Sequence, residues 1–413
     1  MENQKAFRRY ENFIVIAMFF LFGIVFMDRL AIMNLFPFIV PELGLNNTQV
    51  GMVTAGMGIA WALSNIIFAP LSDYFGTKKK MLIVFIFLFS FFTFASGLIG
   101  GFLSLLIVRV LMATFEGPVI PLVNSAVMAA STPKRRGFNM GFVQSASALF
   151  GSALVPGIVV AIALSMNWRS AFFILAIPGI VMALLLMKFM KEPALKDESQ
   201  PKLTGKDFAA IFKERNILLN IVISIFFMVF FTTMTAFVPL FLTSVAGYTE
   251  TQMAAYMTFF GVGIFLWNFL APWISDRIGR KPAMVIFTLI NISVPLSVAF
   301  LHDQYALLLP LTLLFTAGMG YQPLALAIIP AESVPRPLVA TAIAVIVCVG
   351  EGIGGTLGPI LSGILADRFD LYMPLWVVAA ACLMAFLVSW GIKETAPVKM
   401  KTDTKPAEAA VHG

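Results

Sequence analysis

The chain has 413 residues, of which 60% are hydrophobic and 12% are charged, and its formal net charge is +7. A soluble globular domain is about half apolar and about one quarter charged, so this composition excludes an ordinary soluble protein. The apolar residues form long blocks, and a block of about 20 such residues spans a bilayer as a helix. We therefore predict an all-α membrane protein.

Twelve apolar blocks follow one another along the chain, centred near residues 25, 60, 90, 117, 151, 179, 229, 262, 290, 318, 351 and 381. Twelve spanning helices use about 250 to 300 residues, which leaves short loops and no room for a soluble catalytic domain. The first block is longer than the apolar part of a signal peptide and lacks an A-x-A cleavage site. We therefore expect it to be a spanning helix.

The basic residues gather in the N-terminus, alternate loops, the central loop and the C-terminal tail, as in the runs 78–80 and 134–136. The intervening loops carry Arg169 and Arg368. Loops rich in Lys and Arg stay in the cytoplasm, so we predict a multi-pass protein of the plasma membrane, in bacteria the inner membrane, with both termini cytoplasmic. The positive charge then indicates topology, and we expect no nucleic-acid binding.

The sequence repeats itself at one offset. Asp73 recurs as Asp276, and Gly151 recurs as Gly354, both 203 residues later. The dipeptide Lys-Glu at 191–192 recurs at 393–394. Two pseudo-symmetric halves of six helices are typical of transporters. We predict an N-terminal bundle, a cytoplasmic linker, a C-terminal bundle and a disordered cytoplasmic tail, at residues 1–190, 191–215, 216–395 and 396–413.

The loop after the second helix carries the motif that identifies a family. The segment LSDYFGTKKK contains Asp73, Gly76 and Lys78, and its copy ISDRIGRKP contains Asp276 and Gly279. The motif resembles the loop signature of the major facilitator superfamily, with alanine and proline in place of its first glycine. The resemblance implies that fold and assigns these five residues to a cytoplasmic gate. The alternative is that Asp73 is a solvated turn residue.

Five charged residues lie inside predicted helices: Asp28, Arg29, Arg109, Glu116 and Glu351. Each costs about 2.5–3.5 kcal/mol at a helix centre, so such residues face a bundle interior or a cavity and find partners. Consecutive residues point about 100° apart on a helix, so Asp28 and Arg29 have different neighbours. Arg109 and Glu116 are seven residues apart and share one face of a helix.

Two intramembrane arginines favour an anionic substrate, because a guanidinium keeps its charge and binds a carboxylate through two hydrogen bonds. A substrate that takes the arginine leaves the partner acid ready for a proton. With two arginines and three acids ionised the charge is −1, so a loaded carrier needs at least one proton, and Glu116 is the first choice. The alternative is a set of ion pairs that only holds the helices in register.

The Asp28-Arg29 pair, with Arg109, Glu116 and Gly117 followed by Pro121, resembles the anion:cation symporters of the superfamily. That resemblance implies proton-coupled symport of a sugar acid such as an aldonate or hexuronate, with proton sites at Asp28 and Glu116 and the arginines at the substrate. Further polar candidates for the substrate hydroxyls are Asn34, Asn124, Gln144, Asn268, Tyr321 and Gln322. Glu351 is either a ligand of the substrate, a proton site or a structural residue.

The cysteines, Cys348 and Cys382, lie in predicted helices and the two histidines lie in a loop and the tail. We therefore expect no metal site, no enzyme activity and no cofactor, with protons as the coupling ion. The expected partners are a small anionic substrate and the lipid bilayer, and the protein is expected to be monomeric. A drug–proton antiporter of the same superfamily is one alternative, and a transporter-like membrane sensor is another.

Overall fold

The computed structural model describes residues 2–75, 77–132, 134–192, 211–396 and 399, apart from the side chains of residues 2–7, 69–75 and 336. Within these residues twelve helical segments are long and apolar enough to cross a membrane, from Arg8–Leu43 to Tyr372–Ser389. The prediction of twelve spanning helices is confirmed. The predicted linker and tail lie largely outside the described residues.

The first six spans are formed by the elements α1 (Glu2–Leu43), α2 (Asn47–Phe75), α3 (Lys78–Ser96), α4 (Phe102–Glu116), α5 (Val119–Ala130), α6 (Arg136–Ala146), η1 (Ser147–Leu154), α7 (Val155–Ser165) and α8 (Trp168–Phe189). In the second half the elements are α10 (Arg215–Ser244), α11 (Glu250–Ile278), α12 (Arg280–Asn291), α13 (Ser293–Leu301), α14 (Tyr305–Phe315), η2 (Thr316–Gly320), α15 (Tyr321–Pro323), η3 (Leu324–Ile328), α16 (Ile329–Ser333), η4 (Arg336–Leu338), α17 (Val339–Val349), η5 (Gly350–Gly354), α18 (Gly355–Arg368) and α19 (Tyr372–Ser389).

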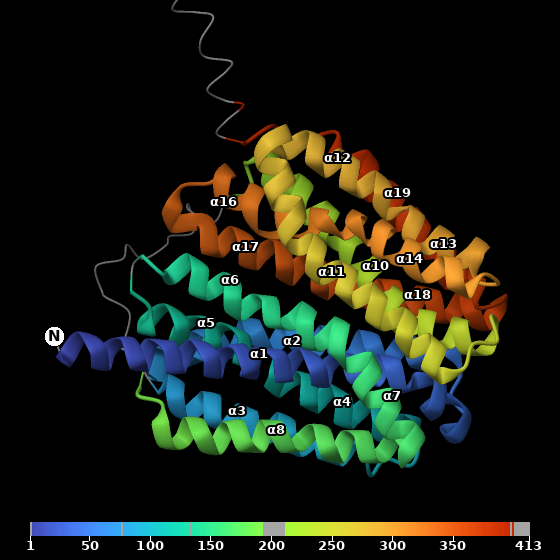
Figure 1. Cartoon of the computed structure of the whole chain (residues 1–413), viewed down its shortest axis with the longest axis horizontal. Coiled ribbons are helices and arrows are strands. Elements are labelled where there is room, and N and C mark those ends of the chain that lie inside the picture. Colours follow the sequence, from blue (N-terminus) through green and yellow to red (C-terminus); the bar gives the residue numbers. More distant parts are fainter. Residues whose placement is uncertain (1, 76, 133, 193–210, 397–398, 400–413) are drawn as a thin grey trace, which may run out of the picture. The chain divides into compact units, whose positions relative to one another are not determined.

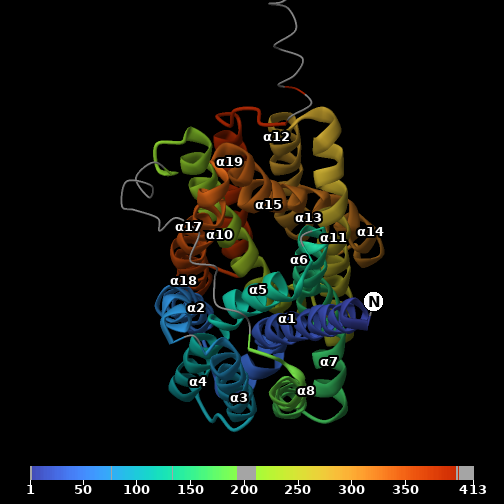
Figure 2. The same cartoon turned by 90° about the vertical axis from the view of Figure 1, so that its left-hand side faces the viewer.

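The chain divides into two compact units. Unit 1 comprises Met1–Asp197, Thr235–Val262 and Pro359–Leu371, and unit 2 comprises Glu198–Met234, Gly263–Gly358 and Tyr372–Gly413. In unit 1, α3 packs between α4 and α8, α2 packs on α4, and α1 contacts α5, α6, η1 and α8. Figure 1 shows α3 beside α8, and Figure 2 shows α3 between α4 and α8. The predicted domain boundaries stay predictions.

Close helix contacts recur at the offset of the repeat. Gly117 separates α4 from α5, and a Cβ there would lie 2.7 Å from the carbonyl oxygen of Trp61 in α2 and closer still to a serine hydroxyl. Gly320 ends η2, and a Cβ there would overlap the Cβ of Ala271 in α11. Small residues let membrane helices approach closely, so the repeat preserves the same contact in both halves.

Wide helical turns recur in the same way. The π-helical segments η1 and η5 begin at Ser147 and Gly350, so they fall at corresponding places in the fifth and eleventh spans. Gly151 of η1 packs against Phe26 of α1, and Gly354 of η5 packs against the backbone of Ile225 in α10. Such local departures from the α-helix are frequent at functional sites.

The repeated Lys-Glu dipeptide caps a helix in each half. Glu192 accepts a hydrogen bond of 2.9 Å from the backbone N–H of Lys79, at the start of α3. Glu394 accepts one of 2.7 Å from the N–H of Arg280, at the start of α12. A carboxylate is favourable at this positive end of a helix dipole.

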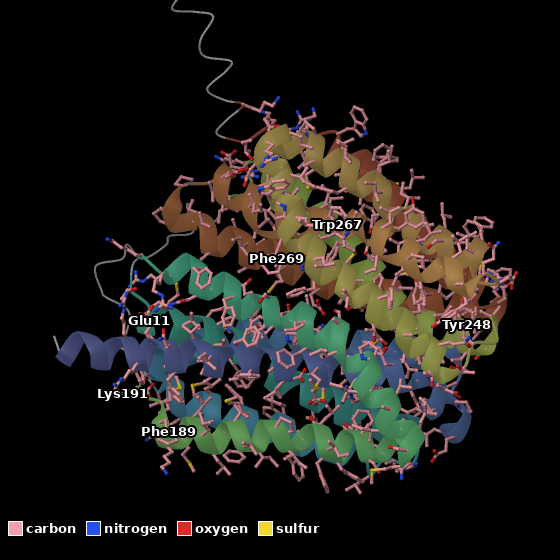
Figure 3. The ribbon with its side chains drawn as sticks, in the orientation of Figure 1. Glu11, Phe189, Lys191, Tyr248, Trp267 and Phe269 are labelled. Carbon is pink, nitrogen blue, oxygen red and sulfur yellow. The ribbon has the colours of Figure 1, made fainter. Side chains whose placement is uncertain are left out.

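In Figure 3, Lys191 and Glu11 lie at one end of unit 1 and Tyr248 at the other.

Replacing Gly117 with alanine is expected to destabilise the contact between α2 and the α4–α5 break, because the added methyl group would press on the Ser64 hydroxyl and would lie 2.7 Å from the Trp61 backbone carbonyl, which cannot turn aside. Overpacking of this kind costs about 1–3 kcal/mol. The purified Gly117→Ala protein should melt at a lower temperature in detergent. Gly141→Ala is the matched control, because a Cβ there meets nothing within 4 Å. Equal melting temperatures would contradict this account of the glycine.

Candidate functional site

An ion pair lies buried in unit 1. Arg109 of α4 places its Nη1 3.6 Å from Oδ1 of Asp28 in α1, and both side chains are almost completely buried. Its Nη2 also donates a hydrogen bond of 3.1 Å to the backbone carbonyl of Asp28. The ring of Phe172 in α8 covers the guanidinium, with 5.2 Å between Cζ and the ring centre. Three helices therefore surround this cation.

Thr93 of α3 completes the surroundings of Asp28. Its fully buried hydroxyl donates to Oδ2 of Asp28 and also lies 2.9 Å from the carbonyl oxygen of Phe89, one turn earlier in its own helix. Among the described residues, Thr93 is the side chain that donates a hydrogen bond to the Asp28 carboxyl. The 3.6 Å between Nη1 of Arg109 and Oδ1 of Asp28 exceeds hydrogen-bond distance. α1, α3 and α4 thus meet at one carboxyl.

Arg29 points to a different neighbour, as the helical spacing predicts. Its guanidinium lies 4.8 Å from the centre of the Trp61 ring in α2, and its side chain is half-buried. A cation over an indole face is attracted by the ring quadrupole. Arg29 therefore keeps part of its surface accessible, whereas Arg109 does not.

Glu116 is the last residue of α4 and is fully buried. Neither of its carboxyl oxygens has a hydrogen-bond partner in the part of the chain that the structure describes. It lies within electrostatic reach of Asp28, Arg109 and Arg29. Nε and Nη1 of Arg109 also lack hydrogen bonds among the described groups. Buried polar groups without partners are rare, and a role in binding or proton transfer is one reason for keeping them.

Four of the predicted polar candidates carry buried oxygens without a hydrogen-bond partner among the described residues, namely Asn34, Asn124, Asn268 and Tyr321. Gln144 is exposed and Gln322 is half-buried. Asn34 donates its amide to the Leu30 carbonyl at 3.1 Å.

Asn34 also lines a small cavity in unit 1. Its volume of about 10 Å³ suits roughly one water molecule or one hydroxyl group. The cavity is lined by Leu30, Asn34, Gly151, Ser152, Pro156, Thr235, Met257 and Phe260. The π-helical segment η1 thus contributes two small residues, Gly151 and Ser152, to the wall of this cavity.

Glu351 lies in unit 2, in the π-helical segment η5, and is buried. Its Oε1 lies 3.5 Å from the position of a Cβ on Gly355, and Cγ2 of Thr232 from α10 lies close to the same position. Asn268, Tyr321 and Gln322 belong to the same unit. The structure therefore groups Asp28, Arg29, Arg109 and Glu116 in unit 1, and Glu351 belongs to unit 2.

The predicted cytoplasmic gate is described in part. Gly76 and the side chain of Asp73 lie outside the described residues. Lys78 donates a hydrogen bond of 3.0 Å to the hydroxyl of Ser125 in α5. In the second copy Asp276 pairs with Arg280 at 2.6 Å, and Gly279 has φ +107°, which favours glycine.

Arg280 extends this second copy into a network. It also pairs with Glu332 of α16 at 2.9 Å, and its backbone N–H is held by Glu394. These contacts of Arg280 join α11 and α12 to α16 and to Glu394, which follows α19.

Three contacts of the charged cluster escaped the sequence analysis: Thr93, Phe172, and Trp61 as the residue beneath Arg29. Thr93 lies in the run FIFLFSFFTFAS, where apolar residues on every face hide the side that meets α1. That run contains two polar residues before its final serine, Ser90 and Thr93. Their place among phenylalanines was the available sign of a polar contact with another helix.

Curated relatives match between about half and most of the chain. It is 34% identical over 197 residues to the hexuronate transporter of Bacillus subtilis, covering 45% of this chain and 46% of that protein. It is 30% identical over 186 residues to the probable L-galactonate transporter of Escherichia coli, covering 45% and 40%. The chain thus matches less than half the length of these two relatives. The D-galactonate transporter of Escherichia coli O6:H1 is 23% identical, with coverage of 92% and 94%.

Solved structures share the fold. A D-xylose–proton symporter superposes with a TM-score of 0.74 at 19% identity, covering 92% of this chain and 98% of that one. A bacterial homologue of the human lysosomal transporter Spinster, inward-facing and unoccupied, gives a TM-score of 0.75 at 19% identity, covering 92% and 97%. The model of the Major Facilitator Superfamily matches residues 18–355. The chain therefore belongs to the Major Facilitator Superfamily.

Proposed function

We propose that the chain carries an organic anion, most simply a sugar acid such as an aldonate or hexuronate, together with protons, and that it does so by alternating access as a monomer. The observation that carries the proposal is the buried Asp28–Arg109 pair beside Glu116. Relatives described as hexuronate, L-galactonate and galactarate/D-glucarate transporters support the substrate class. We place it in the bacterial inner membrane with both termini cytoplasmic.

Charge balance supports proton coupling. Asp28, Glu116, Arg29 and Arg109 sum to zero when all four are ionised. A monovalent anion entering this group makes it negative, and a net charge in an apolar interior is costly. One proton on either Asp28 or Glu116 restores neutrality. We therefore propose at least one proton for each monovalent anion.

Arg29 and Arg109 bind the substrate at different steps in this proposal. Arg29 is half-buried over Trp61, so its guanidinium meets the incoming carboxylate first. Arg109 is engaged by Asp28, so the substrate takes that guanidinium only as Asp28 gives it up. The released carboxyl then binds a proton. Loading of anion and proton are thereby linked.

Either Arg29→Lys or Arg109→Lys is expected to lower uptake of the sugar acid by about tenfold or more, because lysine keeps the charge but loses the forked donors. Uptake is measured in vesicles with a panel of aldonates, hexuronates and the matching neutral sugars. Arg8→Lys, at an exposed position, is the control. Normal uptake by both variants at wild-type abundance in the membrane would remove the arginines from the substrate site.

Glu116→Gln is expected to keep substrate exchange but to lose accumulation driven by a proton gradient, because glutamine imitates the protonated acid. Two assays on one vesicle preparation separate these properties: counterflow without a gradient, and uptake with an alkaline interior. Accumulation at the wild-type level would show that Glu116 is not an essential coupling residue and would leave Asp28 or Glu351 as the alternative.

A hydrogen-bonded contact in unit 1 supports alternating access. Asp367, at the end of α18, accepts hydrogen bonds from the backbone N–H groups of Asn47 at 2.9 Å and Thr48 at 2.8 Å. The Thr48 hydroxyl adds a third at 2.5 Å. A carboxylate at the start of α2 is favoured by the helix dipole. In the proposed topology this contact lies on the outer side, and it has to open when substrate enters from there.

A double variant with cysteines at positions 48 and 367, made without Cys348 and Cys382, is expected to lose transport on oxidation and to regain it on reduction. The disulfide would hold α2 and α18 together in the arrangement that the three hydrogen bonds now maintain. Each single-cysteine protein is a control and should be insensitive to the oxidant. Unchanged transport by the quantitatively cross-linked protein would show that this contact never opens in the cycle.

A further inference from the structure

Thr93 is the one described partner of Asp28 that can both give and accept a hydrogen bond. A hydroxyl has one proton to donate and two lone pairs that accept, whereas a guanidinium only donates. The Thr93 oxygen is within reach of two acceptors, Oδ2 of Asp28 and the carbonyl oxygen of Phe89. With one proton it can serve only one of them at a time.

The two acceptors correspond to two protonation states. When Asp28 is ionised, Thr93 donates to the carboxylate, and the Phe89 carbonyl retains its helical backbone bond. When Asp28 binds a proton, its O–H donates to the Thr93 oxygen, and the hydroxyl proton turns to Phe89 at 2.9 Å. Only the proton from solution is added. Oδ2 of Asp28 and the Thr93 hydroxyl therefore each keep a hydrogen-bond partner in both states.

We propose that Thr93 is the positioning residue that keeps Asp28 hydrogen-bonded through protonation, by reversing the direction of their shared hydrogen bond. This inference rests on the proposed proton-coupled transport for its role, but the reversal itself is a property of the Asp28–Thr93 pair. It explains why a hydroxyl stands on α3 at a fully buried place in a phenylalanine-rich run.

The charged neighbours of Asp28 act on it differently. Arg109 of α4 favours the ionised form, Glu116 of the same helix opposes it, and Phe172 of α8 is apolar. Arg29, the next residue of α1, faces Trp61 of α2. These groups set the proton affinity but cannot exchange donor and acceptor roles with it. Thr93, on α3, is the neighbour that can exchange donor and acceptor roles with Asp28.

The test follows protonation of Asp28 in the purified full-length protein by infrared spectroscopy, using Asp28→Asn to identify its carboxyl band. Thr93→Val removes the hydroxyl and keeps the shape. Because the ionised state loses a charge-assisted hydrogen bond and the protonated state a weaker neutral one, the protonation midpoint should rise by about 0.5–1 pH unit. The carboxyl C=O band should move to higher frequency.

Thr93→Ser restores the hydroxyl and should return both the midpoint and the band to wild-type values. Thr312→Val is the matched control, since its buried hydroxyl donates to Leu308 of its own helix at 2.7 Å in unit 2. If Thr93→Val does not fold, Thr93→Ala gives the same expected shift. A wild-type midpoint and band in the folded hydroxyl-free variant would overturn the proposal.

Uptake as a function of pH in the same variants separates this inference from the transport proposal. If Thr93→Val shifts the Asp28 titration but wild-type uptake ignores the proton gradient, the hydrogen-bond reversal stands and the coupling proposal falls. If wild-type uptake is proton-driven and Thr93→Val leaves both the titration and the pH profile unchanged, Thr93 has no part in coupling.

Discussion

The ion pair between Asp28 and Arg109 is the constraint on which the first bundle depends. A charge in an apolar interior is costly, and a partner compensates for that cost only when the geometry holds both charges together. Losing one partner of a buried pair costs about 3–5 kcal/mol, because the other charge stays behind. The helices α1, α3, α4 and α8 therefore have to keep their register around Asp28, Thr93, Arg109 and Phe172.

The repeat duplicates the scaffold but not this chemistry. Close glycine contacts, π-helical segments and carboxylate caps recur about 203 residues apart. At the same offset Asp28 corresponds to Phe231, and Arg109 corresponds to Thr312, whose hydroxyl bonds to its own helix. At the two positions of this ion pair, the second bundle thus has an apolar and a neutral residue, and its buried acid, Glu351, lies elsewhere, in η5. This division explains why the four grouped charges belong to unit 1.

Much of the fold could be predicted from the sequence, because each span is an apolar block and the two halves share repeated residues. The cost of burying a charge also predicted that Asp28 and Arg109 would have partners, and the helical spacing predicted that Arg29 would face elsewhere. Which groups pair across helices was a different matter. Arg109 shares a helix face with Glu116 but pairs with Asp28, because the rotation of α4 against α1 is set by packing rather than by sequence spacing.

The same limit applies to neutral partners. Thr93 stands in a segment with phenylalanine on every side, so no periodicity identifies the face that meets Asp28. A charged residue in such a segment attracts notice through its cost, whereas a threonine hydroxyl can bond to its own helix at little cost. Its importance comes from the carboxyl brought beside it by the packing of α1 on the bundle, and only the three-dimensional arrangement shows that.

Coupling between an anion and a proton needs no more than one guanidinium with two competing partners. If a substrate carboxylate replaces Asp28 at Arg109, Asp28 loses its counter-charge and binds a proton more tightly. Linkage requires the reverse as well: a proton on Asp28 must raise the affinity for the anion by the same factor. The effect grows where the dielectric is low, which is where the structure places this pair. In the proposed function, the burial that makes the pair costly to maintain therefore also strengthens the coupling between anion and proton.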